Sequence, residues 1–339
     1  MTPQQWVAAR LPAGVAHLDA AACGRVSAAA LDAEVAHLRD EAARGGYVAE
    51  ADADDGRDDL SALLGGALVA WSDSAATAFS TLLAAWPLER GARVGTVTSD
   101  YGGNALSLAA LARARGWELV PLPVDPLGRV TDVPAGLDLV TFPQVASQRG
   151  VAQPVQDVLG RGVPLVLDVA QSLGQTPVPP GCAAYVGTSR KWLCGPRGVG
   201  FLAVDPALEP LLASPPVLVR EGGVRRFDSQ EAHVAGRAGL GVAVREWSPD
   251  LLPLVHARAA QVRTALAAHG VVEPVDEPTG ITTLRVDDPV AARARLLDRG
   301  LLVSAVPTSR SADLDAPVLR VSTHAWVTDA DVDALASAL

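Results

Sequence analysis

Short apolar runs alternate with helical patterns through the first two-thirds of this chain, and this alternation constrains the fold more than any other feature. Helical patterns over Asn104–Arg115 and Pro154–Leu159 lie between apolar runs. Strands and helices that alternate in this way form a mostly parallel sheet with helices on both faces, and the ligand site is expected at the carboxyl ends of the strands. The predicted strands are Arg93–Val97, Glu118–Leu122, Leu137–Phe142, Leu165–Val169, Ala183–Val186 and Gly200–Val204.

The pattern changes after about Gly236. A chain of 339 residues is long enough for two domains. We expect a large domain over residues 15–235, and a smaller α/β domain formed by residues 236–339 together with residues 1–14. The acidic run Glu50–Asp59 is expected to be a solvated loop. The elements predicted for the small domain are helices at Leu251–His269, at Val290–Arg299 and from Thr328, and strands at Ile281–Val286, Leu301–Ala305 and Val318–Ser322.

Composition excludes several classes of protein. The net charge is −10 and there is no basic run, so a nucleic-acid partner is not expected. No apolar stretch reaches the roughly 18 residues of a membrane-spanning helix, and the N-terminus has no signal-peptide pattern, so we expect a cytoplasmic protein without a membrane partner. The three cysteines are widely spaced, which predicts neither a disulfide framework nor a zinc or other metal site.

One residue stands out by its rarity. Of the 28 basic residues, 27 are arginine and one, Lys191, is lysine. Arginine stays protonated and cannot act as a nucleophile near neutral pH, so a lysine retained in such a chain indicates a need for its amine. A chance surface lysine is the alternative interpretation.

The chain supplies candidates for each demand of pyridoxal phosphate (PLP) chemistry. Lys191 can bind the cofactor's aldehyde as a Schiff base, and an acid must keep the pyridine nitrogen protonated. Asp168 ends a predicted buried strand and suits this role, although it could simply cap the following helix. Ser72–Ser74 opens a helical run, where free amides and hydroxyls can hold a phosphate, but this pattern is also an ordinary helix start.

Five motifs, in order along the chain, resemble those of the class V aminotransferase family of fold-type I PLP enzymes. They are HLDAAACGRVS at 17–27, SDYGGN at 99–104, DVAQ at 168–171, TSRKWLCGPRGVG at 188–200 and LRVSTHAW at 319–326. A single motif has a high false-positive rate, but five in order are specific. The resemblance implies an α/β fold-type I enzyme, PLP as cofactor, and a homodimer with its active site at the subunit interface.

The resemblance also assigns roles to residues. It implies that Tyr101 stacks on the pyridine ring, that Asp168 and Gln171 serve the ring nitrogen and the phenolic oxygen, and that Arg320 binds the substrate carboxylate. Ser147 is a further candidate for contacting the substrate. The residues implied for the phosphate and its surroundings are Ser74, Ala75, Thr188, Arg190 and Ser229.

Three of these positions depart from the family pattern. Ala75 replaces a hydroxyl, Arg190 replaces the histidine before the lysine, and Glu231 stands where a threonine of the partner subunit usually reaches the phosphate. A carboxylate at this position would repel the phosphate, because both groups are negatively charged. Ser229 is therefore the candidate substitute for that contact.

A missing cysteine narrows the reaction. Cysteine desulfurases and selenocysteine lyases of this family carry a nucleophilic cysteine shortly before the carboxylate arginine, whereas this chain has none after Cys194. Without that thiolate, sulfur cannot be taken up as a persulfide. We therefore do not expect a persulfide-forming cysteine desulfurase. Transamination, racemisation and β-elimination stay open.

Local strings narrow the resemblance further. GGYVAE, DYGGN, RKWLCGP and RRFDSQEAHVAGRAGLG are similar to segments of the PLP-dependent lyases of ergothioneine biosynthesis. The resemblance implies a small amino-acid sulfur substrate, hercynylcysteine sulfoxide, cleaved at its carbon–sulfur bond to a sulfenic acid, pyruvate and ammonia. Tyr47 is the candidate for facing the trimethylammonium group, and packing of its loop is the alternative. A class V aminotransferase, another cysteine-conjugate lyase and a non-catalytic PLP-binding regulator remain alternatives.

Overall fold

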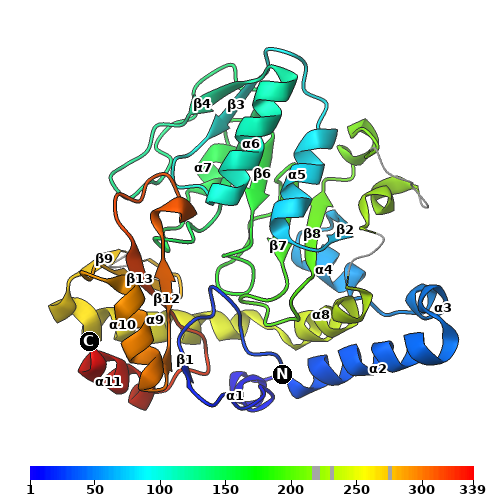
Figure 1. The fold of residues 1–339 in the computed structure, drawn as a ribbon. Helices are drawn as coiled ribbons and strands as arrows, with labels where there is room; N and C mark the ends of the chain where they lie inside the picture. Colours follow the sequence, from blue (N-terminus) through cyan, green and yellow to red (C-terminus); the bar gives the residue numbers. More distant parts are fainter. Residues whose placement is uncertain (216–221, 230–232, 274–276) are drawn as a thin grey trace.

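A seven-stranded sheet forms the centre of the protein (Figure 1). The structure, a computed structural model, describes residues 1–215, 222–229, 233–273 and 277–339. The strand order is β2-β8-β7-β6-β5-β3-β4, and every neighbouring pair is parallel except those that involve β8. This confirms the mostly parallel α/β sheet. The strands are β2 (Leu68–Ser72), β3 (Arg93–Thr96), β4 (Glu118–Pro121), β5 (Leu139–Pro143), β6 (Leu165–Asp168), β7 (Ala184–Thr188) and β8 (Gly200–Val204).

Helices cover both faces of this sheet, as Figure 1 shows. On one face, α5 (Ala75–Ala85) and α6 (Gly102–Arg115) bury Phe79 and Leu108 against strand residues such as Leu139. The opposite face is covered by α4 (Arg57–Leu63), α7 (Val155–Leu159) and α8 (Val234–Glu246). Successive residues of a strand point to opposite faces, which is why the central strands are apolar throughout.

A second core lies beside the sheet. It is built around an antiparallel sheet of order β12-β13-β10-β9 and the short parallel pair β1-β11. Trp6 near the N-terminus is buried in this core, stacked with His324 at 4.6 Å between ring centroids. The strands are β1 (Ala16–His17), β9 (Val271–Glu273), β10 (Ile281–Leu284), β11 (Leu301–Leu302), β12 (Ser304–Val306) and β13 (Val318–Ser322).

The remaining helices complete the two parts. The long α2 packs along α8, at the base of the molecule in Figure 1. These helices are α1 (Pro3–Ala8), α2 (Ala28–Arg44), α3 (Gly46–Ala51), α9 (Leu252–Leu266), α10 (Pro289–Asp298) and α11 (Asp329–Ala338). Short 3₁₀ turns are η1 (Glu209–Leu211), η2 (Gly223–Phe227), η3 (Pro249–Leu251), η4 (Ala267–His269) and η5 (Thr308–Arg310). The domain boundary near residue 235 stays a prediction.

The acidic run Glu50–Asp59 is only in part the solvated loop that we expect from its charge, since Asp52 and Asp54 are exposed but other residues of the run are held by partners. Its ends belong to α3 and α4, and Asp55 accepts a hydrogen bond from the indole nitrogen of Trp71 at 2.5 Å. Asp55 also pairs with Arg57 at 3.2 Å. The density of acidic residues in the sequence suggests a solvent-exposed loop. In the folded chain, however, basic residues from other segments form ion pairs with several of these acids.

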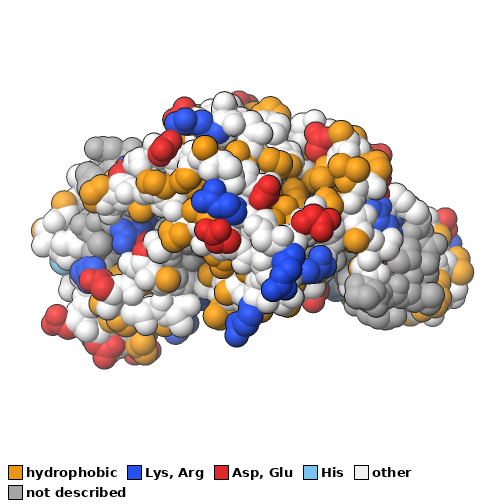
Figure 2. Space-filling model, turned by 90° about the horizontal axis from the view of Figure 1, so that it is seen from above, with side chains coloured by type: hydrophobic (Ala, Val, Ile, Leu, Met, Phe, Trp, Pro, Cys, Tyr) orange, Lys and Arg blue, Asp and Glu red, His pale blue; other side chains and the backbone are white. Residues whose placement is uncertain are grey.

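Surface charge agrees with the composition. Figure 2 shows acidic and basic side chains interspersed over the face seen from above. Within the described ranges, no helix is long and apolar enough to cross a bilayer.

Candidate active site

A cavity of about 360 Å³ opens where β5, β6 and β7 end. The switch from sheet to helix at these strand ends leaves polar backbone and side-chain groups pointing into one space. Residues from the start of α5, from the start of α6 and from the C-terminal core close it. Ten of the predicted site residues line this cavity: Ser74, Ala75, Tyr101, Ser147, Asp168, Gln171, Thr188, Arg190, Lys191 and Arg320.

Lys191 lies in the turn that follows β7. The turn is fixed by backbone bonds, including one from Cys194 to the Lys191 carbonyl at 3.1 Å. Gly24 packs so closely that a Cβ there would lie 2.3 Å from that carbonyl oxygen, so the position requires glycine. Burial, opposed by the charge of Asp168 and reinforced by that of Arg190, lowers the pKa of Lys191 to about 7. Its amine is therefore partly neutral and nucleophilic near neutral pH.

Asp168 is the last residue of β6 and is buried. One carboxylate oxygen accepts the Ala170 amide at 2.7 Å, and the other accepts the Asn104 side-chain amide at 2.8 Å. Burial raises its pKa, while the nearby Lys191 charge opposes that rise. A buried carboxylate with hydrogen bonds that fix its direction suits a protonated ring nitrogen.

A second buried acid lies near this carboxylate. Asp100 accepts the Tyr101 amide at 2.6 Å, and burial together with repulsion from Asp168 holds the pKa of Asp100 well above its usual range. One oxygen of Asp100 is buried without a hydrogen-bond partner among the described residues. Both causes favour the protonated form of Asp100, and repulsion between the two acids is smallest when only one of them is charged.

The start of α5 offers a cradle for a phosphate. The Ser74 hydroxyl caps the helix by accepting the Thr77 amide at 3.1 Å. Gly200 of β8 lies against it, where a Cβ would come within 2.3 Å of the Ser74 backbone. Helix N-termini bind anions through free amides and the helix dipole. Ser74, Ala75 and Thr188 surround this end of the cavity, which fits a phosphate group.

Tyr101 lies where α6 begins, at the N-cap position. A Cβ on Gly103 would come within 2.6 Å of the Tyr101 ring, so glycine lets the ring lie against the helix. The Arg310 guanidinium lies 5.4 Å from the ring centroid. The ring lines the cavity together with Asp168 and Lys191, as a stacking residue should.

Arg320 reaches the cavity from the middle of β13. Its guanidinium donates to the Ser147 carbonyl at 3.0 Å and lies 3.5 Å from Asp19. Its Nε atom is buried and has no hydrogen-bond partner within the described chain. Asp19 is itself held by the Ser304 hydroxyl, 2.8 Å from each carboxylate oxygen. This pre-oriented arginine has donor capacity left for a carboxylate.

The side chain of Gln171 forms hydrogen bonds within the protein beyond its predicted contact with the phenolic oxygen of the cofactor. Its side-chain amide donates to the Ala21 carbonyl at 3.1 Å, and its oxygen accepts the Trp192 indole at 2.9 Å. The second N–H of its amide remains for a ligand. Gln171 therefore also ties the turn after Lys191 to the Ala21–Ala22 wall of the cavity.

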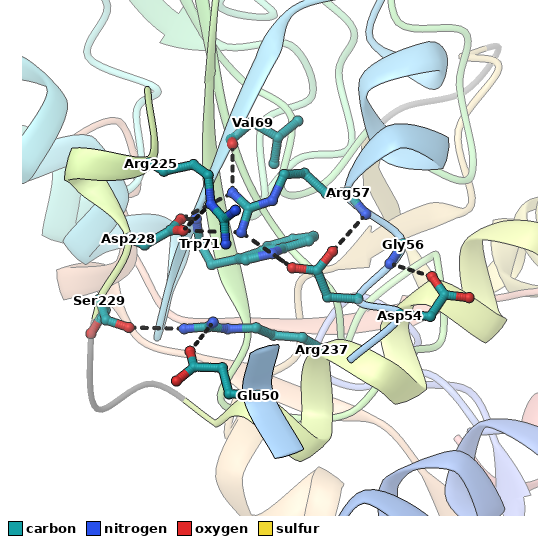
Figure 3. Close-up of polar contacts among 11 residues, drawn as sticks. Glu50, Asp54, Gly56, Arg57, Val69, Trp71, Arg225, Asp228, Ser229 and Arg237 are labelled. Carbon is teal, nitrogen blue, oxygen red and sulfur yellow. Dashed lines mark hydrogen bonds and ion pairs between the residues drawn. The ribbon is translucent and has the colours of Figure 1, made fainter. Parts of the chain in front are cut away.

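Two predicted residues lie elsewhere in the single chain. Tyr47 is on α3 and is 64% exposed, and it does not line the cavity. Ser229 follows η2, where its amide donates to the Trp71 carbonyl at 2.9 Å and its carbonyl accepts from Arg237 at 2.8 Å (Figure 3). Glu231 lies outside the described residues.

A charged cluster holds the segment that carries Ser229, as Figure 3 shows. Arg57 donates to both oxygens of Asp228 at 3.1 and 3.0 Å, and the Trp71 amide donates to the same carboxylate at 2.6 Å. The buried Arg237 pairs with Glu50 at 3.2 Å. This cluster keeps Ser229 beside β2 and away from the cavity of its own chain.

The prediction of site residues from sequence missed Asn104, Asp100, Asp19, Ser304 and Arg310. Asn104 carried a usable signal, since it follows Tyr101 by three residues and a helix brings such residues together. Asp19, Ser304 and Arg310 gave no such signal, because their contacts join segments far apart in the sequence. Asp100 adjoins Tyr101, but no sequence pattern shows that its carboxyl is buried near Asp168. Within the described ranges, no group of three or more His, Cys, Asp or Glu side chains is arranged to hold a metal ion.

Comparisons with known proteins agree with this geometry. Residues 16–238 match the family model described as aminotransferase class V. A probable hercynylcysteine sulfoxide lyase of Mycobacterium tuberculosis is 41% identical, covering 99% of this chain and 92% of that protein. An isopenicillin N epimerase of Amycolatopsis lactamdurans is 29% identical, covering 64% of this chain and 65% of that protein.

Solved structures share the fold. A cysteine desulfurase from Thermococcus onnurineus NA1 superposes with a TM-score of 0.89 at 16% identity, covering 99% of this chain and 97% of that chain. The cystine C–S lyase C-DES gives a TM-score of 0.85 at 17% identity, covering 96% of this chain and 97% of that chain. The predicted fold-type I architecture is confirmed. This chain belongs to the class V aminotransferase family and is a pyridoxal-phosphate-dependent enzyme.

Proposed function

We propose that this enzyme is a carbon–sulfur β-lyase that cleaves hercynylcysteine sulfoxide. The 41% identity to a probable hercynylcysteine sulfoxide lyase over nearly the whole chain supports the substrate. The observation that carries the reaction class is the cavity itself: a lysine, an acid and a carboxylate-binding arginine line it, and no cysteine is among its described lining residues. Such a site can eliminate a β-substituent but cannot accept sulfur.

The thiol closest in sequence to the lining residues does not change this conclusion. Cys23 follows Ala22, and burial raises the pKa of Cys23 more than the nearby Arg190 lowers it. Cys23 is therefore a thiol near neutral pH, whereas the nucleophile that attacks sulfur is a thiolate. A persulfide-forming desulfurase is accordingly not the proposed reaction.

Three residues of the cavity have separate proposed roles in the reaction. PLP, when bound, supplies an electron sink for negative charge at the substrate's α-carbon. Lys191 is the residue proposed to hold the cofactor's aldehyde in the resting enzyme and, once released, to remove the α-proton with its amine. Asp168 would hold a positive charge on the ring nitrogen. Arg320 would fix the α-carboxylate and so orient the α-proton toward Lys191.

Bond cleavage then needs no sulfur acceptor. The bond between the β-carbon and sulfur breaks, and its electron pair leaves with the sulfur as a sulfenate. A sulfenate is a better leaving group than a thiolate because the oxygen shares the charge. The three-carbon fragment takes up water and yields pyruvate and ammonia. This balance explains why a site without a thiolate suffices.

The proposed assembly is a homodimer. In the single chain, Tyr47 and Ser229 lie outside the cavity, so their proposed roles toward the trimethylammonium group and the phosphate require the cavity of the second subunit. Two-fold dimers are the commonest assemblies. Sedimentation of the holoenzyme should give a dimer at all active concentrations, and a stable, active monomer would contradict the proposal.

Substrate comparison tests the reaction class. The holoenzyme is given hercynylcysteine sulfoxide, the corresponding thioether, or cysteine, and pyruvate and sulfide are measured. We expect pyruvate from the sulfoxide at a much higher rate than from the thioether, and no sulfide from cysteine. Sulfide from cysteine as the fastest reaction would indicate a desulfurase instead. A dependence of turnover on an added 2-oxo acid would indicate an aminotransferase.

A further inference from the structure

Three arginines line the cavity, and the chain itself engages two of them. Arg320 donates to the Ser147 carbonyl and faces Asp19. Arg190 donates to the backbone carbonyl of Ala22. The third, Arg310, stacks on the Tyr101 ring at 5.4 Å but forms no hydrogen bond or ion pair through its side chain with the described residues. Of the three, Arg310 is therefore the one whose guanidinium donors meet no acceptor in the part of the chain that the structure describes.

Two acids of the segments around the cavity, Asp313 and Asp19, already have partners among the described residues. Asp313 of the same loop accepts from the Gln148 amide at 2.9 Å and pairs with Arg149 at 2.5 Å. Asp19 is held by Ser304 and Arg320. A half-buried cation without a carboxylate beside it is costly, and an anionic ligand would offset this cost.

The backbone places Arg310 rigidly at the cavity. Arg310 ends η5, and the next residue, Ser311, is buried, donates to the Thr98 carbonyl at 3.2 Å and accepts from Gln148 at 3.0 Å. The loop also packs on the start of α6, where a Cβ on Gly102 would lie 2.4 Å from a loop carbonyl. Because this turn is already anchored, its backbone would lose little conformational entropy when the side chain of Arg310 binds a ligand.

The charge of the cavity points the same way. Its lining holds four cationic side chains, which include Lys191, against two carboxylates, Asp73 and Asp168. The charge of Arg310 contributes, after burial, to the lowered pKa of both Lys191 and Arg320. The start of α5 suits the phosphate and Arg320 suits the α-carboxylate, which leaves Arg310 without an anion.

We propose that Arg310 binds a second carboxylate, one carried by the sulfur substituent of the substrate. The inference rests on the proposed function and deepens it: the enzyme would select S-substituted cysteine sulfoxides whose substituent carries a carboxylate. In hercynylcysteine sulfoxide that group is the carboxylate of the hercynine part. Arg310 would then set specificity, while Arg320 binds the carboxylate next to the reacting carbon.

The test compares a substrate whose S-substituent carries a carboxylate with one whose substituent does not. Arg310→Gln and Arg310→Lys are assayed with hercynylcysteine sulfoxide and with S-methylcysteine sulfoxide. A charge-assisted contact of ordinary strength predicts that Arg310→Gln raises KM for the first substrate about 10- to 100-fold. The KM for the second should change by less than about twofold, and kcat should change little for either, because a distant contact binds ground and transition states alike. Arg310→Lys should restore part of the loss.

A matched control removes one positive charge from an arginine that contacts the same loop but does not line the cavity. Arg285 is exposed and pairs with Asp315 at 2.6 Å. Arg285→Gln should therefore leave both KM values unchanged. Equal losses on the two substrates in Arg310→Gln would overturn the inference. So would loss of the cofactor's absorbance in that variant, because Arg310 would then serve the cofactor.

A binding measurement keeps this inference separate from the proposed function. S-(3-carboxypropyl)-L-cysteine and S-butyl-L-cysteine, which differ in the terminal carboxylate, are titrated into the holoenzyme while the cofactor's absorbance is followed. Wild type should prefer the acidic ligand, and Arg310→Gln should lose that preference. Equal affinities in wild type would overturn the inference. Failure to cleave hercynylcysteine sulfoxide, with the preference intact, would overturn only the proposed function.

Discussion

Asn104 donates a hydrogen bond to Asp168 over 2.8 Å and so joins the first turn of α6 to the end of β6. Both side chains are buried, and the side-chain amide oxygen of Asn104 has no hydrogen-bond partner among the described residues. The bond stabilises the ionised form of Asp168 against the burial that raises its pKa. A carboxylate held in this way can keep a ring nitrogen protonated.

Asn104→Ala should therefore weaken catalysis without removing the cofactor. A hydrogen bond to a charged group is worth about 1.5–3 kcal/mol, so we expect kcat to fall about 10- to 100-fold. The pKa seen in the pH dependence of the cofactor's absorbance should shift as well. Leu106→Ala, at an exposed position of the same helix, is the control and should change neither quantity. Unchanged kcat in Asn104→Ala would show that the bond has no catalytic role.

Lys191 should carry the cofactor. Borohydride reduction of the holoenzyme followed by peptide mapping should place the label on the peptide that contains Lys191, since the chain has no other lysine. Lys191→Ala should lose at least the about 10²- to 10⁴-fold that a positioned general base contributes. A Lys191→Ala protein with full turnover would refute both roles.

The lowered pKa of Lys191 also predicts how stability depends on pH. In the cofactor-free protein the pKa is about 7 when folded, against 10.5 for an ordinary lysine. The unfolded chain therefore binds more protons between these values, and stability rises with pH there. The cost of Lys191 is full below about pH 7 and fades toward pH 10.5.

Chemical denaturation of cofactor-free wild type and of the cofactor-free variant Lys191→Met, each over a range of pH, measures this effect. Lys191→Met fills a similar volume without the charge, so it should be more stable than wild type at pH 7. Its advantage should shrink as pH rises toward 10.5, the ordinary lysine pKa. A difference in unfolding free energy that is independent of pH would show that burial does not shift this amine.

Arg320 should govern affinity for the substrate's α-carboxylate. A lysine cannot reproduce the bidentate contact of a guanidinium, so Arg320→Lys should raise KM about 10- to 100-fold with the cofactor's absorbance intact. Ser304→Ala should have a smaller effect in the same direction, because Ser304 orients Asp19, which lies 3.5 Å from Arg320. An unchanged KM in Arg320→Lys would show that this arginine has a structural role and does not bind the substrate.

The fold was largely predictable because local pattern and tertiary structure agree. Val318–Ser322 and Gly200–Val204 are strands with the predicted bounds. The strand Leu68–Ser72 was missed, since its five residues are continuous with a helix start and carry no alternation. Lys191 and Asp168 could be predicted from residue type and position, because the cofactor's chemistry demands them.

Other parts of the site could not be predicted. Asp19 and Arg320 are 301 residues apart in the chain, and their contact exists only through the register of β13 with its neighbours. The availability of Arg310 depends on which acids are occupied by other partners, which no sequence pattern shows. The aromatic ring of Tyr47 suits contact with a cation, but the sequence does not show that α3 lies away from the cavity of its own chain.

The most direct test of the central claim is a product balance for hercynylcysteine sulfoxide. The purified holoenzyme is incubated with this substrate alone, and pyruvate, ammonia and remaining substrate are measured over time. We predict one pyruvate and one ammonia for each substrate consumed, with no 2-oxo acid, no sulfur acceptor and no protein persulfide required. Consumption without ammonia release, or no consumption at all by fully loaded enzyme, would contradict it.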